Sequence, residues 1–281
     1  MIPKSPFVII FTDLDGTLLD PHTYKWKDAR VALNKCKKSN IPIVLISSKT
    51  RAEIDVIRRE MSLSAPFVSE NGGGIFFPDG LSHDPPKESI HDNGMKKWAL
   101  GIPYPQLVKG LREIRKELDW QIKGFSDMSI DEIADITGLD RKAARLAAMR
   151  EFDEPFVILE KKPPDNNALS EAAWKRGFTV IIGGRFYHLQ GTNDKGMAME
   201  KIVSWYRELH ANVVSVALGD SPNDFSMFEK ADYPVLVKSQ RDFPELQKRV
   251  PHLKVTIEQG PKGWNSAVSD ILQKLLRSTD N

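Results

Sequence analysis

The chain has 281 residues, of which 41% are hydrophobic and 28% charged, and this composition excludes a long disordered chain, a collagen and a disulfide-dense mini-protein. Lys and Arg total 40 against 38 Asp and Glu, so the net charge of +2 gives no argument for a nucleic-acid or anionic-membrane partner. The single cysteine, Cys36, excludes an intramolecular disulfide and a thiol-rich metal site. The first apolar run, residues 7–11, is too short for a signal-peptide core or a membrane span. We therefore expect a cytoplasmic protein.

The first third of the chain alternates apolar runs with helical patterns. The expected buried strands lie at residues 7–11, 41–46, 66–69 and 75–77. Between them, apolar residues recur at three- and four-residue steps, at Ala29, Leu33 and Cys36 and again at Ile54, Ile57 and Met61. Strands that alternate with helices predict βαβ units and a parallel sheet.

The middle third has a different pattern. Ser129 and Glu132 form a capping box at the start of a helix, and Asp140 is placed to cap the next one. The strands expected here lie at residues 156–159, 178–182 and 186–189, with a Gly183-Gly184 hairpin turn between the last two. The last third returns to alternation, with strands at 213–218 and 233–237 and helices around Ile202 and Ile271. We therefore predict an α/β core, residues 1–83 and 191–281, with an inserted α+β domain at 84–190.

Acidic residues follow two of the expected buried strands. Asp13 and Asp15 come directly after the first strand, and Asp220 and Asp224 follow the strand at 213–218. The carboxyl ends of parallel strands meet at the crevice where α/β proteins bind ligands. Carboxylates there could hold Mg²⁺, and one of them could attack an electrophile. The structural alternative is a turn and a solvated polar loop.

Two further polar residues stand at expected element ends. Ser47 ends the second strand, where its hydroxyl could donate to a phosphoryl oxygen or cap the helix that follows. Lys195 precedes the helix around Ile202, where it could neutralise the acids and hold a phosphate, or lie at the surface.

These stretches occur in an order that resembles the haloacid dehalogenase superfamily of phosphotransferases. In chain order they are Asp13-x-Asp15, Ser47, Lys195 and Gly219-Asp220-x3-Asp224. The resemblance spans essentially the whole chain. It implies a Rossmann-like parallel-sheet core, and it implies that the inserted segment is the α/β (C2B) cap of the Cof-like subclass.

The resemblance also implies roles for these residues. Asp13 would be the nucleophile that forms an aspartyl-phosphate, and Asp15 would be the general acid and then the general base. Ser47 and Lys195 would bind phosphoryl oxygens, and Asn223 would orient the site. Mg²⁺ would be held by the Asp13 carboxylate, the Asp15 backbone carbonyl and Asp220, with Asp224 as a further ligand or support.

Four outer stretches resemble one family in this superfamily, the mannosyl-3-phosphoglycerate phosphatases. These stretches are residues 45–51, 69–72, 133–156 (most clearly at 151–156) and 183–188. The resemblance implies hydrolysis of mannosyl-3-phosphoglycerate to mannosylglycerate, with a cap that reads the leaving group. Lys49, Arg185 and His188 are the candidate contacts to that group.

Three other functions stay open at this point. The same chemistry could act on another sugar phosphate, such as glucosyl-3-phosphoglycerate or a hexose phosphate. The Asp13 and Asp15 pair could also serve a phosphomutase. A non-catalytic sugar-phosphate-binding module is the third, and an intact nucleophile argues against it. The sequence makes no prediction of the oligomeric state.

Overall fold

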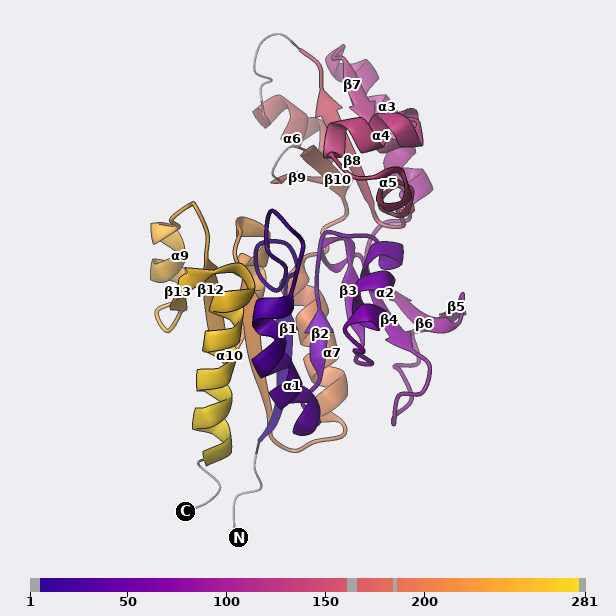
Figure 1. The fold of residues 1–281 in the computed structure, drawn as a ribbon. Helices are drawn as coiled ribbons and strands as arrows, with labels where there is room; N and C mark the ends of the chain where they lie inside the picture. The colour runs from indigo at the N-terminus through magenta and orange to yellow at the C-terminus, as the bar shows by residue number, and fades with distance from the viewer. Residues whose placement is uncertain (1–5, 161–165, 184–185, 278–281) are drawn as a thin grey trace.

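The computed structural model describes residues 6–160, 166–183 and 186–277, and its centre is a five-stranded parallel sheet (Figure 1). The strand order is β13-β12-β11-β1-β2, and every neighbouring pair is parallel. Their bounds are β1 (Phe7–Thr12), β2 (Ile43–Leu45), β11 (Val213–Gly219), β12 (Tyr233–Lys238) and β13 (Lys254–Gln259). The prediction of a parallel sheet is confirmed.

Helices cover both faces of this sheet because its central strands are apolar on both. In β1, Ile10 packs into one hydrophobic cluster and Phe11 into a second cluster on the opposite face. The helices of the first cluster are α1 (Arg30–Lys38), α2 (Arg51–Glu60) and α10 (Gly260–Arg277). Those of the second are α7 (Lys195–Arg207), α8 (Phe225–Lys230) and α9 (Pro244–Arg249). Cys36 is a buried apolar residue of α1, as expected.

A second, antiparallel sheet continues from the edge of the parallel one. Its order is β3 (Phe67–Ser69), β4 (Gly74–Pro78), β6 (Met95–Ala99) and β5 (Ile90–Asp92), and a bridge between Ile46 and Val68 connects it to β2. The segment from Ile90 to Ala99 therefore belongs, by strand pairing, with β4. The chain leaves this sheet only after Ala99, and the domain boundary near residue 84 stays a prediction.

A third sheet forms the centre of the inserted domain, which lies above the core in Figure 1. Its order is β7 (Ile122–Gly124), β8 (Asp153–Ile158), β10 (Phe186–Gln190) and β9 (Thr179–Gly183), all antiparallel. Helices α3 (Tyr104–Leu118) and α6 (Asn166–Trp174) pack on one face, and α4 (Ile130–Thr137) and α5 (Arg141–Ala147) pack near Phe186 on the other. We refer to this domain as the cap.

The helix caps and the hairpin that the sequence predicted for the cap are present. Ser129 and Glu132 make the predicted capping box of α4, and the Asp140 side chain accepts from Ala143 N–H at the start of α5. The antiparallel pairing of β9 with β10 confirms the hairpin, but Gly183, predicted in the turn, is the last residue of β9 and pairs with Phe186. Gly184 lies outside the described residues. Among the described residues, no helix combines the length and hydropathy needed to cross a membrane.

Candidate active site

Three acidic side chains meet at the carboxyl edge of the parallel sheet. Asp13 directly follows β1, where its N–H donates to the Leu218 carbonyl at 2.9 Å, and Asp220 directly follows the adjacent strand β11. Asp224, four residues after Asp220, is the last residue of a single 3₁₀ turn (Pro222–Asp224). One carboxylate oxygen from each of the three acids lies within 4.8 Å of the other two. The topology thus brings together residues that are more than 200 positions apart.

Lys195 lies between two of these acids. It is the first residue of α7, is fully buried, and donates to Asp13 Oδ1 at 2.7 Å and to Asp224 Oδ1 at 2.6 Å. Burial by itself would lower the pKa of Lys195, but the attraction of Asp13 and Asp224 outweighs burial and raises it. The lysine therefore stays charged and is not at the surface.

The single positive charge of Lys195 does not neutralise the three carboxylates around it. Burial raises the pKa of Asp13 to about 7, against the opposing effect of Lys195. Burial, then the charges of Asp13 and Asp224, raise the pKa of Asp220 to about 8. A cluster of hard carboxylate oxygens with excess negative charge has the donor chemistry that suits a small divalent cation, so the residues present fit Mg²⁺.

Asp15 lies apart from this cluster and forms an ion pair with Lys49. The Lys49 Nζ to Asp15 Oδ2 distance is 2.8 Å, and Asp15 Oδ1 has no hydrogen-bond partner among the described residues. Gly16 between Asp15 and Thr17 has φ of +77°, and a Cβ there would lie 2.5 Å from Asp220 Oδ2. A glycine is thus required for this turn to pass beside Asp220.

Ser47 is buried at the end of β2, next to β1. Its N–H donates to the Val68 carbonyl at 3.1 Å, and its Oγ accepts from Lys49 N–H at 3.3 Å. Because Oγ acts only as an acceptor there, its proton is available to a ligand. The sequence prediction of a polar Ser47 at the same sheet edge as Asp13 agrees with this placement.

Two residues that sequence reasoning gave no site role connect these loops. Asn71 N–H donates to the Ser47 carbonyl at 3.0 Å, and Asn223 Nδ2 donates to Asn71 Oδ1 at 3.1 Å. Thr17 Oγ1 donates to Asp220 Oδ1 at 3.2 Å. The sequence did offer a signal for each residue. Asn71 lies in the 69–72 stretch, and Thr17 directly follows Asp15-Gly16.

The candidate leaving-group contacts have three different placements. Lys49 lies against Asp15, as described. His188 lies in the cap on β10, with its Nδ1 2.8 Å from Asp153 Oδ2. Arg185 lies outside the described residues, so its contact stays a prediction.

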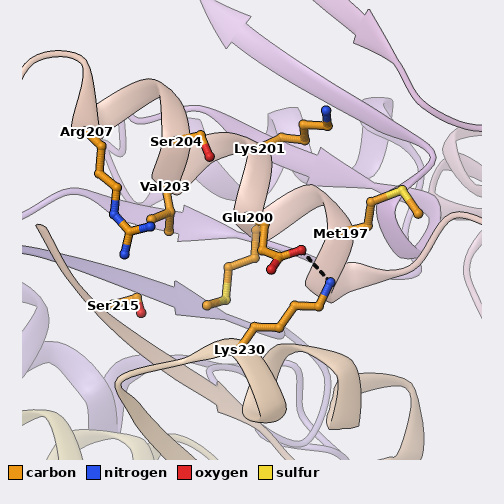
Figure 2. Close-up of a pocket in the computed structure, with 9 residues that line it drawn as sticks. Met197, Glu200, Lys201, Val203, Ser204, Arg207, Ser215 and Lys230 are labelled. Atoms are coloured by element: carbon orange, nitrogen blue, oxygen red, sulfur yellow. Dashed lines mark hydrogen bonds and ion pairs between the residues drawn. The ribbon is translucent and has the colours of Figure 1, made fainter.

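A cavity of about 320 Å³ lies elsewhere, beside α7 and α8 (Figure 2). Its lining residues are Met197, Met199, Glu200, Lys201, Val203, Ser204, Arg207, Ser215 and Lys230. None of them was predicted to act in the site, and Glu200 already pairs with Lys230 at 2.5 Å. The acidic cluster at the sheet edge, and not this cavity, is the candidate active site.

Comparison with known proteins decides the family. Residues 10–100 match the family of haloacid dehalogenase-like hydrolases. A protein of Methanococcoides burtonii is 39% identical over 271 residues, which cover 95% of this chain and 97% of that protein. A protein of Persephonella marina is 37% identical over 280 residues, covering 96% and 99%. Both are named glucosyl-3-phosphoglycerate/mannosyl-3-phosphoglycerate phosphatase. This chain belongs to the haloacid dehalogenase-like phosphatases.

The fold of this haloacid dehalogenase-like phosphatase agrees with that assignment. A solved phosphatase of the superfamily from Bacteroides thetaiotaomicron superposes with a TM-score of 0.67 at 18% identity and covers 98% of both chains. The chain thus shares the fold of this solved structure over nearly its whole length, inserted domain included. The chain is an enzyme, and its reaction class is phosphate-ester hydrolysis.

Proposed function

We propose that this phosphatase hydrolyses a glycosyl-3-phosphoglycerate, with mannosyl-3-phosphoglycerate as the principal substrate and glucosyl-3-phosphoglycerate as the second candidate. One observation carries this choice of substrate. The two relatives named for these esters are similar over at least 95% of the chain, which includes the cap. Similarity confined to the core would have supported only the phosphatase chemistry, because the core motifs serve any phosphate monoester.

The proposed first step uses Asp13 and Asp15. The Asp13 carboxylate attacks phosphorus, the bond from phosphorus to the glycerate oxygen breaks, and that oxygen takes a proton from Asp15. In the second step Asp15 takes a proton from water, which attacks the aspartyl-phosphate. The bond from phosphorus to Asp13 then breaks, and inorganic phosphate leaves.

Asp15 must leave its ion pair with Lys49 in the course of these two steps. Asp15 is ion-paired with Lys49 in this structure, and the second step uses its carboxylate as the proton acceptor. The first step requires a protonated Asp15, so the pair has to separate as the substrate enters. Lys49 Nζ would then be available to the anionic substrate beside the same carboxylate.

Ser47 and Lys195 bind the phosphoryl group in this proposal. The free proton of Ser47 Oγ supplies one donor. Lys195 is already held by Asp13, so its charge lies beside the attacking carboxylate and lowers the repulsion between nucleophile and phosphate. The hydrogen bonds from Asn223 to Asn71 and from Asn71 to Ser47 hold the loop of Asp220 against the loop of Ser47.

Mg²⁺ would be held by the Asp13 and Asp220 carboxylates and the Asp15 carbonyl, with Asp224 as a further ligand or a support for Lys195. When bound, the cation supplies positive charge that offsets the repulsion between a carboxylate and an anionic phosphate ester. Asp224 is suited to support, since its Oδ2 accepts the N–H groups of Asp220 and Ser221 at 3.0 and 3.1 Å while its Oδ1 binds Lys195.

A phosphate-release screen tests the proposed function. The panel contains mannosyl-3-phosphoglycerate, glucosyl-3-phosphoglycerate, two hexose phosphates and p-nitrophenyl phosphate, each with Mg²⁺. We expect kcat/KM to be highest on one of the two glycerate esters. A higher value on a hexose phosphate would contradict the substrate assignment. Transfer of phosphate to a second sugar hydroxyl, without phosphate release, would indicate a mutase.

A further inference from the structure

A chain of hydrogen bonds runs from the cap to the loop of Ser47. Arg150 Nη1 donates to the Ser48 carbonyl at 2.9 Å and to Asp153 Oδ2 at 3.2 Å. Asp153 Oδ2 lies 2.8 Å from His188 Nδ1. The side chains of Arg150, Asp153 and His188 are only 8%, 0% and 13% exposed. Three hydrogen bonds therefore connect a cap histidine to the residue that follows Ser47.

The strand register explains why these two cap residues meet. In the pairing of β8 with β10, Asp153 lies opposite Gln190 and Pro155 lies opposite His188. Asp153 and His188 are thus diagonal neighbours on one face of the cap sheet. The opposite face, which carries Phe156 and Leu189, packs against α3 and α6.

The partners of Asp153 define the orientation of the His188 ring. An ionised carboxylate only accepts hydrogen bonds, so Arg150 and His188 Nδ1 are both donors to Asp153. No hydrogen bond to His188 Nε2 is found within the described residues, which leaves that nitrogen for a ligand. Asp153 Oδ1 is buried without a hydrogen-bond partner in the same described set. A fully buried carboxylate with one oxygen unpaired costs stability, and a buried polar group of this kind needs an explanation beyond packing.

We propose that Asp153 is a positioning residue that holds His188 so that Nε2 accepts a hydroxyl of the leaving group, and that Arg150 keeps this pair in register with the Ser47 loop. The proposal rests on the proposed function, because it assigns the leaving group to the cap. In the tautomer that donates Nδ1–H to Asp153, Nε2 carries no proton and can accept a hydrogen bond. A substrate whose phosphoryl group lies at Ser47 would extend toward this ring, since Ser48 and His188 are joined through Arg150 and Asp153.

The test compares Asp153→Asn and His188→Asn, alone and combined, on the preferred ester and on p-nitrophenyl phosphate. The readout is the ratio of kcat/KM on the two substrates. We expect either variant to lower this ratio roughly ten- to thirty-fold, mainly through a higher KM, and the double variant to lose no more than either alone. Asp127→Asn is the matched control, because Asp127 pairs with Arg115 in the cap, 3.2 Å away, and has no hydrogen bond or ion pair with His188 within the described residues.

A spectroscopic measurement separates positioning from a merely structural role. The ¹⁵N shifts of the His188 ring should report a protonated Nδ1 in the wild type and a changed tautomer population in Asp153→Asn. A ratio that stays constant in His188→Asn, or additive losses in the double variant, would overturn the proposal. If the wild type hydrolyses neither glycerate ester, the proposed function fails. The same variants on whichever panel ester has the larger leaving group still decide the role of His188.

Discussion

Lys49 Nζ lies 2.8 Å from Asp15 Oδ2, so the proposed general acid of this phosphatase is ion-paired with a lysine from the neighbouring loop. Lys49 also lies 5.5 Å from the centre of the Tyr24 ring. Burial would lower the pKa of Lys49, but the charges of Asp15 and Glu53 outweigh it and raise the pKa. The lysine is therefore a permanent cation beside Asp15 at neutral pH.

Replacement of this lysine should affect turnover more than stability. We expect Lys49→Met to lower kcat/KM on the preferred ester about tenfold, because Asp15 loses the partner that holds it and the substrate loses a nearby cation. The melting temperature should change little, because Asp15 is 41% exposed and stays hydrated when Lys49, 15% exposed, loses its charge. Steady-state kinetics with Lys49→Arg as the charge-preserving control checks this, and an unchanged kcat/KM in Lys49→Met would contradict it.

Asp13→Asn should abolish turnover and leave the fold intact. An amide cannot form the aspartyl-phosphate, so we expect a fall in kcat of roughly 10⁴-fold or more. The Asn oxygen can still accept from Lys195, and the loss of one charge relieves the repulsion with Asp220 and Asp224. The melting temperature should therefore stay equal or rise. Near-normal phosphate release by this variant would show that another residue is the nucleophile.

Activity should require a divalent cation, with Mg²⁺ best and Ca²⁺ poor or inhibitory, because the larger Ca²⁺ prefers more ligands and a looser geometry. The affinity should also depend on pH. Ligand carboxylates must be ionised to bind, and the raised pKa values of Asp13, about 7, and Asp220, about 8, mean that protons compete below these values.

We therefore expect the apparent Mg²⁺ affinity to fall from pH 8 to pH 6, by up to roughly tenfold per pH unit for each proton displaced. Titration calorimetry at several pH values measures this directly. Full activity after exhaustive chelation would contradict the metal requirement, and a pH-independent affinity would contradict the role of the two aspartates as ligands.

Glu70 should make the stability of the protein depend on pH. Its fully buried carboxylate accepts the N–H of Phe152 at 2.7 Å and that of Glu151 at 3.1 Å, across the junction of core and cap. Burial raises its pKa to about 8, while Arg150 and these N–H groups oppose the rise. Between pH 4.5 and 8 the folded protein keeps a proton that the unfolded chain has lost. The free energy of unfolding should therefore fall as pH rises through this window, by at most about 1.4 kcal/mol per pH unit from this group.

Glu70→Gln isolates the contribution of Glu70 ionisation to stability, because Gln does not titrate and its amide oxygen can still accept from the Phe152 N–H. Denaturant unfolding of both proteins from pH 5 to pH 9 gives the difference in unfolding free energy. We expect the wild type to lose stability relative to the variant with rising pH, and to level off above pH 8. Parallel curves for the two proteins would show that Glu70 does not bind a proton in this range.

The sequence by itself determined which acidic side chains meet at the sheet edge. Continuous apolar runs predicted the strands β1, β2 and β11, and the acids that follow β1 and β11 had to converge, because the carboxyl ends of parallel strands share one edge. The order of Asp13, Ser47, Lys195 and Asp220 then indicated the family, which the comparison confirmed. The predicted roles of these residues stay predictions.

Only the tertiary structure decided which side chains are partners over long distances. The ion pair of Lys49 with Asp15 and the Arg150–Asp153–His188 chain were not anticipated, and the contact of Lys49 with the leaving group stays a prediction. Strands β5 and β6 were also missed, because their charged residues give no buried-strand pattern. Periodicity and capping are local properties that the sequence encodes within one element. The choice of partner depends on sheet register and on how core and cap pack, and no local pattern specifies either.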